Sequence, residues 1–93
     1  MDLAFEWDDK KSNKNLKKHG IAFEEAATVF GDPLSITIPD PKHSKAEHRF
    51  IIIGESVQRR TLVVVHVERT DKIRIISARR ATRREKKIYE EKN

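Results

Sequence analysis

Arginine is the residue type in this sequence whose number and position best suit a chemical role. Six arginines follow residue 68, namely Arg69, Arg74, Arg79, Arg80, Arg83 and Arg84. A guanidinium group is planar and always charged, and its donors match the oxygens of a phosphate. Cleaving RNA without a metal requires help to the 2′-hydroxyl, stabilisation of the pentacovalent phosphate and a proton for the leaving 5′-oxygen. Arginine and lysine supply the second of these, so an enzyme that relies on them needs no obvious histidine pair.

The charge of the chain is concentrated in the same region. The whole sequence has a net charge of +5, but residues 1–68 carry −1 and residues 69–93 carry +6. A cationic surface attracts polyanions and releases their counterions on contact. A solvated helix face with no ligand is the alternative. Because most of the excess is arginine, we favour a nucleic acid as the ligand.

Candidates for proton transfer lie at two places. His66 and Glu68 are two positions apart in a predicted strand, so they share a face and could act as a base and its orienter. We favour the alternative that His66, between two valines, is a partly buried sheet histidine. Lys18 and His19 end a predicted helix, where cations are stabilised by the helix dipole. A structural role and a functional role are equally consistent with these two residues.

Other chemistries lack their motifs. The chain has no cysteine and no cluster of glycines, and its histidines lack the spacing of a zinc site: His19, His43, His48 and His66. His43 and His48 bracket a loop and are expected to be exposed. We therefore expect neither a metal nor a cofactor. Trp7 and Tyr89 could stack on bases. Trp7 fits a core position better, and Tyr89 fits either role.

Length and composition limit the architecture to a single domain over residues 1–93. No apolar run approaches the roughly 20 residues of a membrane helix, and the N-terminus lacks the order of a signal peptide. The absence of cysteine fits a reducing compartment. We expect a cytoplasmic protein that makes no membrane contact.

The pattern of apolar residues predicts the order β-α-α-β-β-β-β-α, an α+β domain with a mainly antiparallel sheet and its helices packed on one face. Asp8 or Asp9 should cap the first helix and Gly20 should end it. Thr82 and Glu85 have the spacing of a capping box, which should begin the last helix. The predicted strands are 3–7, 34–38, 49–54, 61–69 and 72–78. The first predicted helix runs from its cap at Asp8 or Asp9 to about His19, and the other two are about 23–30 and 83–91.

A two-residue loop, Thr70-Asp71, would fix the register of the last hairpin. It would place eight side chains on one face, as the pairs Leu62–Arg79, Val64–Ser77, His66–Ile75 and Glu68–Ile73. Arg69, Lys72 and Arg74 would share the other face. Helices on one sheet face would bury the Phe23 stripe and the row Val63, Val65 and Val67, which would leave the opposite face free for a ligand.

Motifs over nearly the whole chain resemble those of the BrnT toxins. They are Phe5-Glu6-Trp7-Asp8, Lys18-His19-Gly20, Phe23-Glu24-Glu25-Ala26, Asp32-Pro33, Glu68-Arg69, and Ile73-Arg74-Ile75-Ile76-Ser77-Ala78-Arg79 with Glu85 and Tyr89. The sequence departs from the family at Thr70, where glycine is usual, and at Ala22, where a capping residue is common.

The resemblance implies a RelE-like fold and a ribonuclease that inhibits translation. It also implies a BrnA-type ribbon-helix-helix antitoxin, joined with the toxin in a heterotetramer that reaches DNA through the antitoxin. On this basis we expect metal-independent endoribonuclease chemistry. Lys18, Arg69 and Arg79 would stabilise the phosphorane, and His19 or Glu68 would transfer protons. RNA would be held by Arg74, Arg80, Arg83, Arg84 and Tyr89.

Two other functions remain open from the residues alone. The absence of an indisputable acid–base pair is consistent with a non-catalytic module that binds RNA or protein. Direct DNA binding by the last helix ranks lowest, because that helix is short and no helix-turn-helix precedes it.

Overall fold

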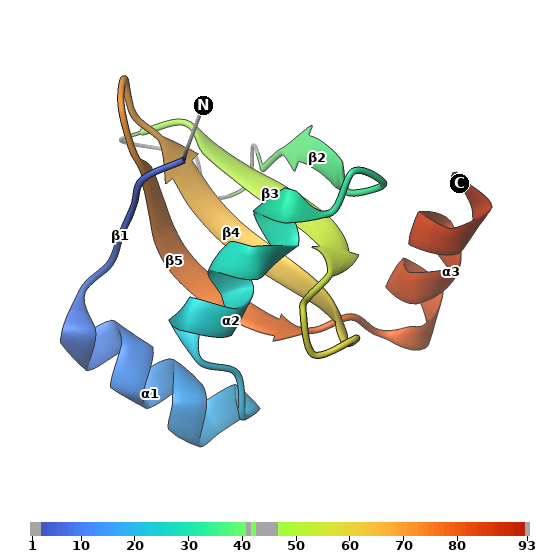
Figure 1. The fold of residues 1–93 in the computed structure, drawn as a ribbon, viewed down its shortest axis with the longest axis horizontal. Coiled ribbons are helices and arrows are strands. Elements are labelled where there is room, and N and C mark those ends of the chain that lie inside the picture. The colour runs from blue at the N-terminus through green and yellow to red at the C-terminus, as the bar shows by residue number, and fades with distance from the viewer. Residues whose placement is uncertain (1–2, 41, 43–46, 93) are drawn as a thin grey trace.

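A computed structural model describes residues 3–40, 42 and 47–92 (Figure 1). The elements follow the predicted order: β1 (Phe5–Glu6), α1 (Asp9–His19), α2 (Phe23–Thr28), the 3₁₀ turn η1 (Val29–Gly31), β2 (Ile36–Pro39), β3 (Arg49–Glu55), β4 (Thr61–Glu68), β5 (Ile73–Arg80) and α3 (Arg83–Glu91). Among the described residues, none of the helices has the length and apolar character that a membrane span requires.

The five strands form one mixed sheet in the order β1-β5-β4-β3-β2. The short β1 pairs in parallel with the start of β5, and the other neighbours are antiparallel. Short connections between β3, β4 and β5 require this arrangement. The predicted α+β class with a mainly antiparallel sheet is therefore confirmed.

Local capping explains where the helices begin and end. The Asp8 side chain accepts hydrogen bonds from the backbone of Lys10 and Lys11, and Gly20, at φ 71°, donates to the carbonyl of Leu16. Residue 22 supplies no side-chain cap to α2, which passes into η1 after Thr28 rather than reaching Phe30 as an α-helix. The predicted capping box is present at the start of α3.

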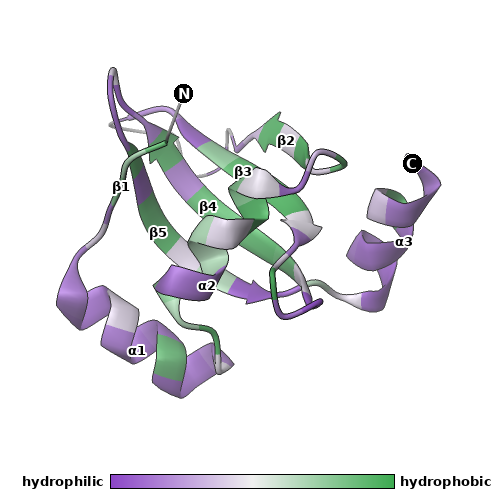
Figure 2. Ribbon diagram, viewed as in Figure 1, coloured by the Kyte–Doolittle hydropathy of each residue, from purple (hydrophilic) through white to green (hydrophobic). Residues whose placement is uncertain are grey.

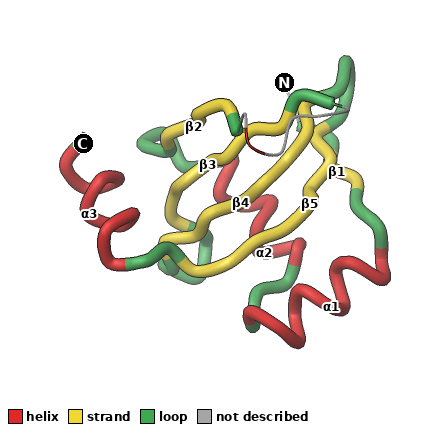
Figure 3. Tube along the Cα trace, turned by 180° about the vertical axis from the view of Figure 1, so that it is seen from behind, coloured by secondary structure: helices red, strands yellow, loops and turns green. Residues whose placement is uncertain are grey.

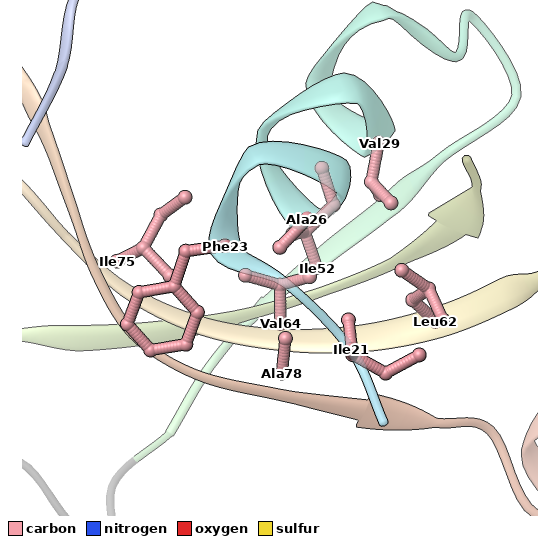
Figure 4. Packing of buried hydrophobic residues seen from close by; sticks show 9 residues of the cluster. All are labelled: Ile21, Phe23, Ala26, Val29, Ile52, Leu62, Val64, Ile75 and Ala78. Atoms are coloured by element: carbon pink, nitrogen blue, oxygen red, sulfur yellow. The ribbon is translucent and has the colours of Figure 1, made fainter. Parts of the chain in front are cut away.

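α2 covers one face of the sheet, α1 lies alongside the outer edge of β5, and α3 lies beyond the strand ends (Figures 1 and 3). Figure 2 shows that α1 and α3 are largely hydrophilic while β3 and β4 carry many hydrophobic residues. The core fills the space between α2 and the sheet (Figure 4). It comprises Ile21, Phe23, Ala26, Val29, Ile52, Leu62, Val64, Ile75 and Ala78.

The row of β4 that packs under the helices is not the predicted one. Leu62 and Val64 belong to the core cluster, whereas Val63, Val65 and Val67 lie on the opposite face. That opposite face is apolar along its centre, because Val63 pairs with Ile53, and Val65 with Ile51. The helix-free face is therefore the one that carries this valine row, and not the one with Leu62 and Val64 that the sequence left free for a ligand; arginines of β5 border it.

A side-chain clamp closes the edge of the sheet beyond β1. β1 pairs only with Ile73 and Arg74, so the outer edge of β5 is unpaired by any described strand from there on. The buried Asn15 of α1 fills this place. Its amide nitrogen donates to the carbonyls of Ala78 and Ile21 (2.8 and 2.9 Å), and its oxygen accepts from the Ala78 amide (3.1 Å). Asn15 therefore completes the hydrogen bonding of Ala78 as a neighbouring strand would.

Candidate functional site

A β-bulge in β5 decides which arginines share a face. The register opposes His66 to Ile75 and Val65 to Ser77, which leaves Ile76 as an extra residue. The predicted pairs His66–Ile75 and Glu68–Ile73 are confirmed. The pairs Leu62–Arg79 and Val64–Ser77 are wrong by one position, because residue 62 faces Arg80 and residue 64 faces Ala78.

The bulge places Arg74, Ser77 and Arg79 on the helix-free face of the sheet. Their cross-strand partners Val67, Val65 and Val63 alternate along β4 and so point the same way. Without the extra residue, Arg74 would point away from the other two. The structure therefore gathers three polar side chains of β5 that simple alternation separates.

Arg79 is held by a carboxylate from α3. Its two terminal nitrogens donate to the two oxygens of Glu85 at 2.7 and 2.9 Å. The Arg79 guanidinium lowers the pKa of Glu85 to about 2, while its own pKa is raised by the same hydrogen bonds. This pair orients Arg79 and neutralises much of its charge.

The remaining predicted RNA-binding residues lie around the same end of β5. Arg80 is exposed and faces Leu62, so it projects toward the helix-covered side, and Arg83 and Arg84 are exposed on the first turn of α3. Tyr89 donates its hydroxyl proton to Asp32 at 2.6 Å. Burial, together with this hydrogen bond, raises the pKa of Tyr89 to about 12. Tyr89 therefore anchors α3 to the residues after η1.

Lys18 and His19 lie beside the bulge. They line a hollow of about 280 Å³ between the last turns of α1 and the edge of β5, together with Lys11, Lys14, Asn15, Ile76 and Ser77. Lys18 is exposed and His19 is partly exposed. Ser77 belongs both to this hollow and to the face that carries Arg79.

Glu68 and Arg69 lie at the other end of β5. Glu68 pairs with Ile73, and Arg69 donates its amide proton to the Lys72 carbonyl at 2.8 Å, which closes the predicted Thr70-Asp71 turn. Both residues border a hollow of about 470 Å³. Arg69 and Arg74 each lie within 4 Å of Glu6.

This position separates Glu68 and Arg69 from Arg79. Ile73 and Arg79 are six residues apart on β5, which corresponds to roughly 20 Å at ~3.3 Å per residue. One phosphate cannot contact both ends of such a strand. The structure therefore does not bring the five predicted catalytic residues together, and only Lys18, His19 and Arg79 approach the same segment of β5.

His66 is the sheet histidine that the sequence favoured. It is fully buried between Phe30 and Phe50, with ring centroids 4.8 and 5.9 Å away. Burial lowers its pKa, although Glu68, 3.3 Å from Nε2, opposes this effect. Since the ring is closed to solvent, it has no path to a substrate. Trp7 likewise packs edge-on against Phe23 and belongs to the periphery of the core.

No group of three histidine or acidic side chains suited to a metal ion occurs within residues 3–40, 42 and 47–92. His48 is exposed as expected, while His43 lies outside the described residues. Sequence reasoning missed one cationic group, which includes Arg59, Arg60 and Lys86 around a hollow next to Arg80. The adjacent arginines of the 55–60 linker were the available signal.

Fold and site together define a small α+β domain with a mainly antiparallel sheet and cationic groups at one end of its longest strands. The family model for the ribonuclease toxin BrnT of type II toxin-antitoxin systems matches residues 7–85. The chain belongs to the BrnT family, a family of ribonuclease toxins.

The fold agrees with a solved structure. The crystal structure of the ribonuclease toxin BrnT from Brucella abortus superimposes with a TM-score of 0.64 and 24% sequence identity. The match covers 88% of the present chain and all of that chain. A search of curated proteins gave no significant match.

Proposed function

We propose that this protein is a metal-independent endoribonuclease that inhibits translation and is neutralised by a BrnA-type antitoxin. The observation that carries the site is the position of Ser77. It lines the hollow of Lys18 and His19 and shares a sheet face with Arg79. An RNA strand that crosses β5 at Ser77 would therefore meet cations from α1 on one side and Arg79 on the other.

In the proposed reaction, the 2′-oxygen of RNA attacks the adjacent phosphorus while the bond from phosphorus to the 5′-oxygen breaks. The 2′-hydroxyl proton passes to a base, and an acid protonates the leaving oxygen. His19 is the proposed proton-transfer group, because it supplies the imidazole in the hollow that Ser77 lines, and imidazole is the commonest general acid–base group. Lys18 and Arg79 stabilise the phosphorane, whose extra negative charge develops only in the transition state.

The other predicted residues would bind the RNA at phosphates other than the one that is cleaved. Arg74 lies on the same face as Arg79, about five residues back along β5, and therefore suits a neighbouring phosphate. Arg80, Arg83 and Arg84 would bind phosphates on the opposite side of the cleavage point. Arg69 and Glu68 are too far from Arg79 to act on the same phosphate. We therefore assign Arg69 to contacts with the RNA further from the cleavage point.

The experiment is a cleavage assay on a defined mRNA in excess chelator. We expect cleavage to persist without divalent metal. Loss of cleavage that Mg²⁺ or Mn²⁺ restores would contradict the metal-free mechanism. Addition of ribosomes to the same assay tests whether translation is inhibited through free or ribosome-bound mRNA.

The partner proposal is tested separately. Co-expression with a ribbon-helix-helix protein encoded beside this chain should protect growth and yield a complex with the mass of a heterotetramer. Duplex DNA should bind the complex and not the toxin alone. A complex that forms without restoring growth would contradict neutralisation.

A non-catalytic RNA-binding module is the second candidate. The neutralisation of Arg79 by Glu85 and the burial of His66 favour it. Induced expression in bacteria distinguishes the two functions, because a toxin arrests growth and degrades transcripts whereas a passive binder leaves transcripts intact.

A further inference from the structure

A second cationic hollow lies on the other side of β5 from Arg79. It has a volume of about 220 Å³ and lies between the β3–β4 turn and the junction of β5 with α3. Its lining consists of Arg59, Arg60, Thr61, Arg80, Ala81 and Lys86. Four of these six residues are cations and none is a carboxylate, so the hollow suits an anion.

One of the four cations serves the fold. Arg60 pairs with Glu25, whose side chain is only 3% exposed, through Nε at 2.9 Å and through a second contact between Nη2 and Oε1. This guanidinium lowers the pKa of Glu25, which also accepts a hydrogen bond from Ser56 at 2.7 Å. The network attaches the β3–β4 turn to α2 and so fixes one wall of the hollow.

The other three cations have no ion pair within the described part of the chain. These are Arg59, Arg80 and Lys86, and all three are exposed. They come from the turn, the end of β5 and the first half of α3. Three separate segments therefore direct uncompensated positive charge at one small volume.

Arg59 occupies a backbone position that favours glycine. Its φ is +62°, and it is the only residue other than glycine with a positive φ in the described ranges. The turn is closed by hydrogen bonds from Arg59 to the Ser56 carbonyl and from Ser56 to the Arg60 carbonyl, both 2.9 Å. Glycine would adopt this conformation without strain. A strained arginine beside two further free cations points to a use for its guanidinium.

We propose that this hollow binds one backbone phosphate of the RNA, flanking the phosphate that is cleaved. Arg79 and Arg80 are consecutive and project to opposite faces of β5. An RNA strand that passes around the end of β5 can therefore place neighbouring phosphates against each face. This inference rests on the proposed function, because it takes RNA as the ligand of the Arg79 face.

The test measures binding of a 2′-O-methyl RNA oligonucleotide, which lacks the attacking hydroxyl and cannot be cleaved. The double variant Arg59→Gln/Arg80→Gln should bind about tenfold more weakly, and its slope of log affinity against log salt should fall by about 0.7 for one lost phosphate. The matched control is Lys10→Gln/Lys17→Gln, which removes two exposed charges from α1 that line none of these hollows. It should change affinity less than twofold.

A third variant distinguishes function from structure. Arg59→Gly removes the guanidinium and relieves the positive φ, so it should raise the melting temperature while weakening RNA binding. Calorimetry with inorganic phosphate alone tests the other source of the anion. If the double variant loses phosphate binding but keeps its RNA affinity, the hollow is a site for free phosphate, and the RNA proposal is overturned.

The remaining outcomes are separable from those of the proposed function. Equal losses of RNA affinity in the double variant and in the lysine control would overturn the proposal that the hollow binds a phosphate. They would leave the proposed cleavage activity unaffected. Wild-type protein that binds the oligonucleotide through Arg59 and Arg80 but leaves unmodified RNA intact would support the hollow and contradict the endoribonuclease.

Discussion

Arg79 and Glu85 face each other across the junction between β5 and α3 and share two hydrogen bonds. The same Glu85 carboxylate accepts from the backbone of Thr82 at 2.8 Å and so completes the capping box of α3. One carboxylate therefore ties the end of the last strand to the start of the last helix. It also holds the proposed catalytic arginine in one orientation.

This relationship predicts a specific dependence of stability on pH. The folded-state pKa of Glu85 is about 2, below its ordinary value of 4.5. Its contribution is therefore complete above about pH 4.5 and is lost as the pH falls toward 2. Glu85→Gln, which keeps a capping side chain, should lower the free energy of unfolding by about 1–2 kcal/mol at pH 7, since partial exposure of Arg79 screens the pair. Urea titrations should show the two proteins converging near pH 2, and curves that stay parallel would refute this assignment.

Two substitutions of Arg79 should show how much of its effect on RNA cleavage comes from its charge and how much from the shape of its guanidinium. Arg79→Gln should reduce RNA cleavage at least 100-fold, which is the usual effect of removing one donor to a developing oxyanion. Arg79→Lys should recover only part of the activity, because lysine cannot form the two-pronged contact. Cleavage rates under saturating RNA provide the measurement. Wild-type rates in Arg79→Gln would show that the site lies elsewhere.

Neighbouring lysines of α1 provide a matched pair for the Ser77 hollow. Lys18 lines the hollow, whereas Lys17 does not, and both are exposed. Lys18→Gln should lower kcat about 10–100-fold with little change in stability, and Lys17→Gln should be nearly neutral. Similar effects of the two variants on kcat would indicate a general effect of charge and not a placed group.

Asn15 should be the most sensitive polar residue of α1. Asn15→Ala removes three hydrogen bonds and leaves backbone groups of Ala78 and Ile21 unsatisfied, which should cost about 2–4 kcal/mol. The exposed Asn13 of the same helix is the control, and Asn13→Ala should change stability by less than about 0.5 kcal/mol. Chemical denaturation of both variants makes this comparison.

His66 should act on stability and not on catalysis. Its folded-state pKa is lowered, so below its ordinary value of 6.5 the unfolded chain binds a proton that the folded chain resists. Stability should therefore fall as the pH drops below 6.5. His66→Phe should flatten this part of the profile and retain RNA cleavage. Loss of cleavage in a well-folded His66→Phe protein would restore His66 as a candidate base.

Local signals in the sequence predicted most of the fold correctly. Asp8, Gly20 and the Thr82–Glu85 pair mark helix ends by short-range hydrogen bonding, which depends only on neighbouring residues. The predicted register also holds from the Thr70-Asp71 turn to His66 and Ile75. Thr70 has no positive φ, so its departure from glycine leaves the turn intact.

The site was predicted less well, since its geometry depends on long-range features. An inserted residue at Ile76 leaves no mark in an alternating pattern, yet it moves Ser77 and Arg79 to the other face. The distance between Glu68 and Arg79 likewise follows from strand pairing. Arg59 looked like part of a linker, because its role depends on a turn conformation and on Arg80 and Lys86, which lie more than twenty positions further along the chain.

The Asn15 clamp has a consequence for how the protein behaves when it accumulates. An uncovered strand edge offers a template on which other copies can grow into fibrils. Here Ala78 is already satisfied, the bulge at Ile76 interrupts the regular edge, and the lysines of α1 repel a second copy of the same charged surface. The β5 edge of the sheet is thus protected, and copies of the protein at high concentration should not pair with one another through β5.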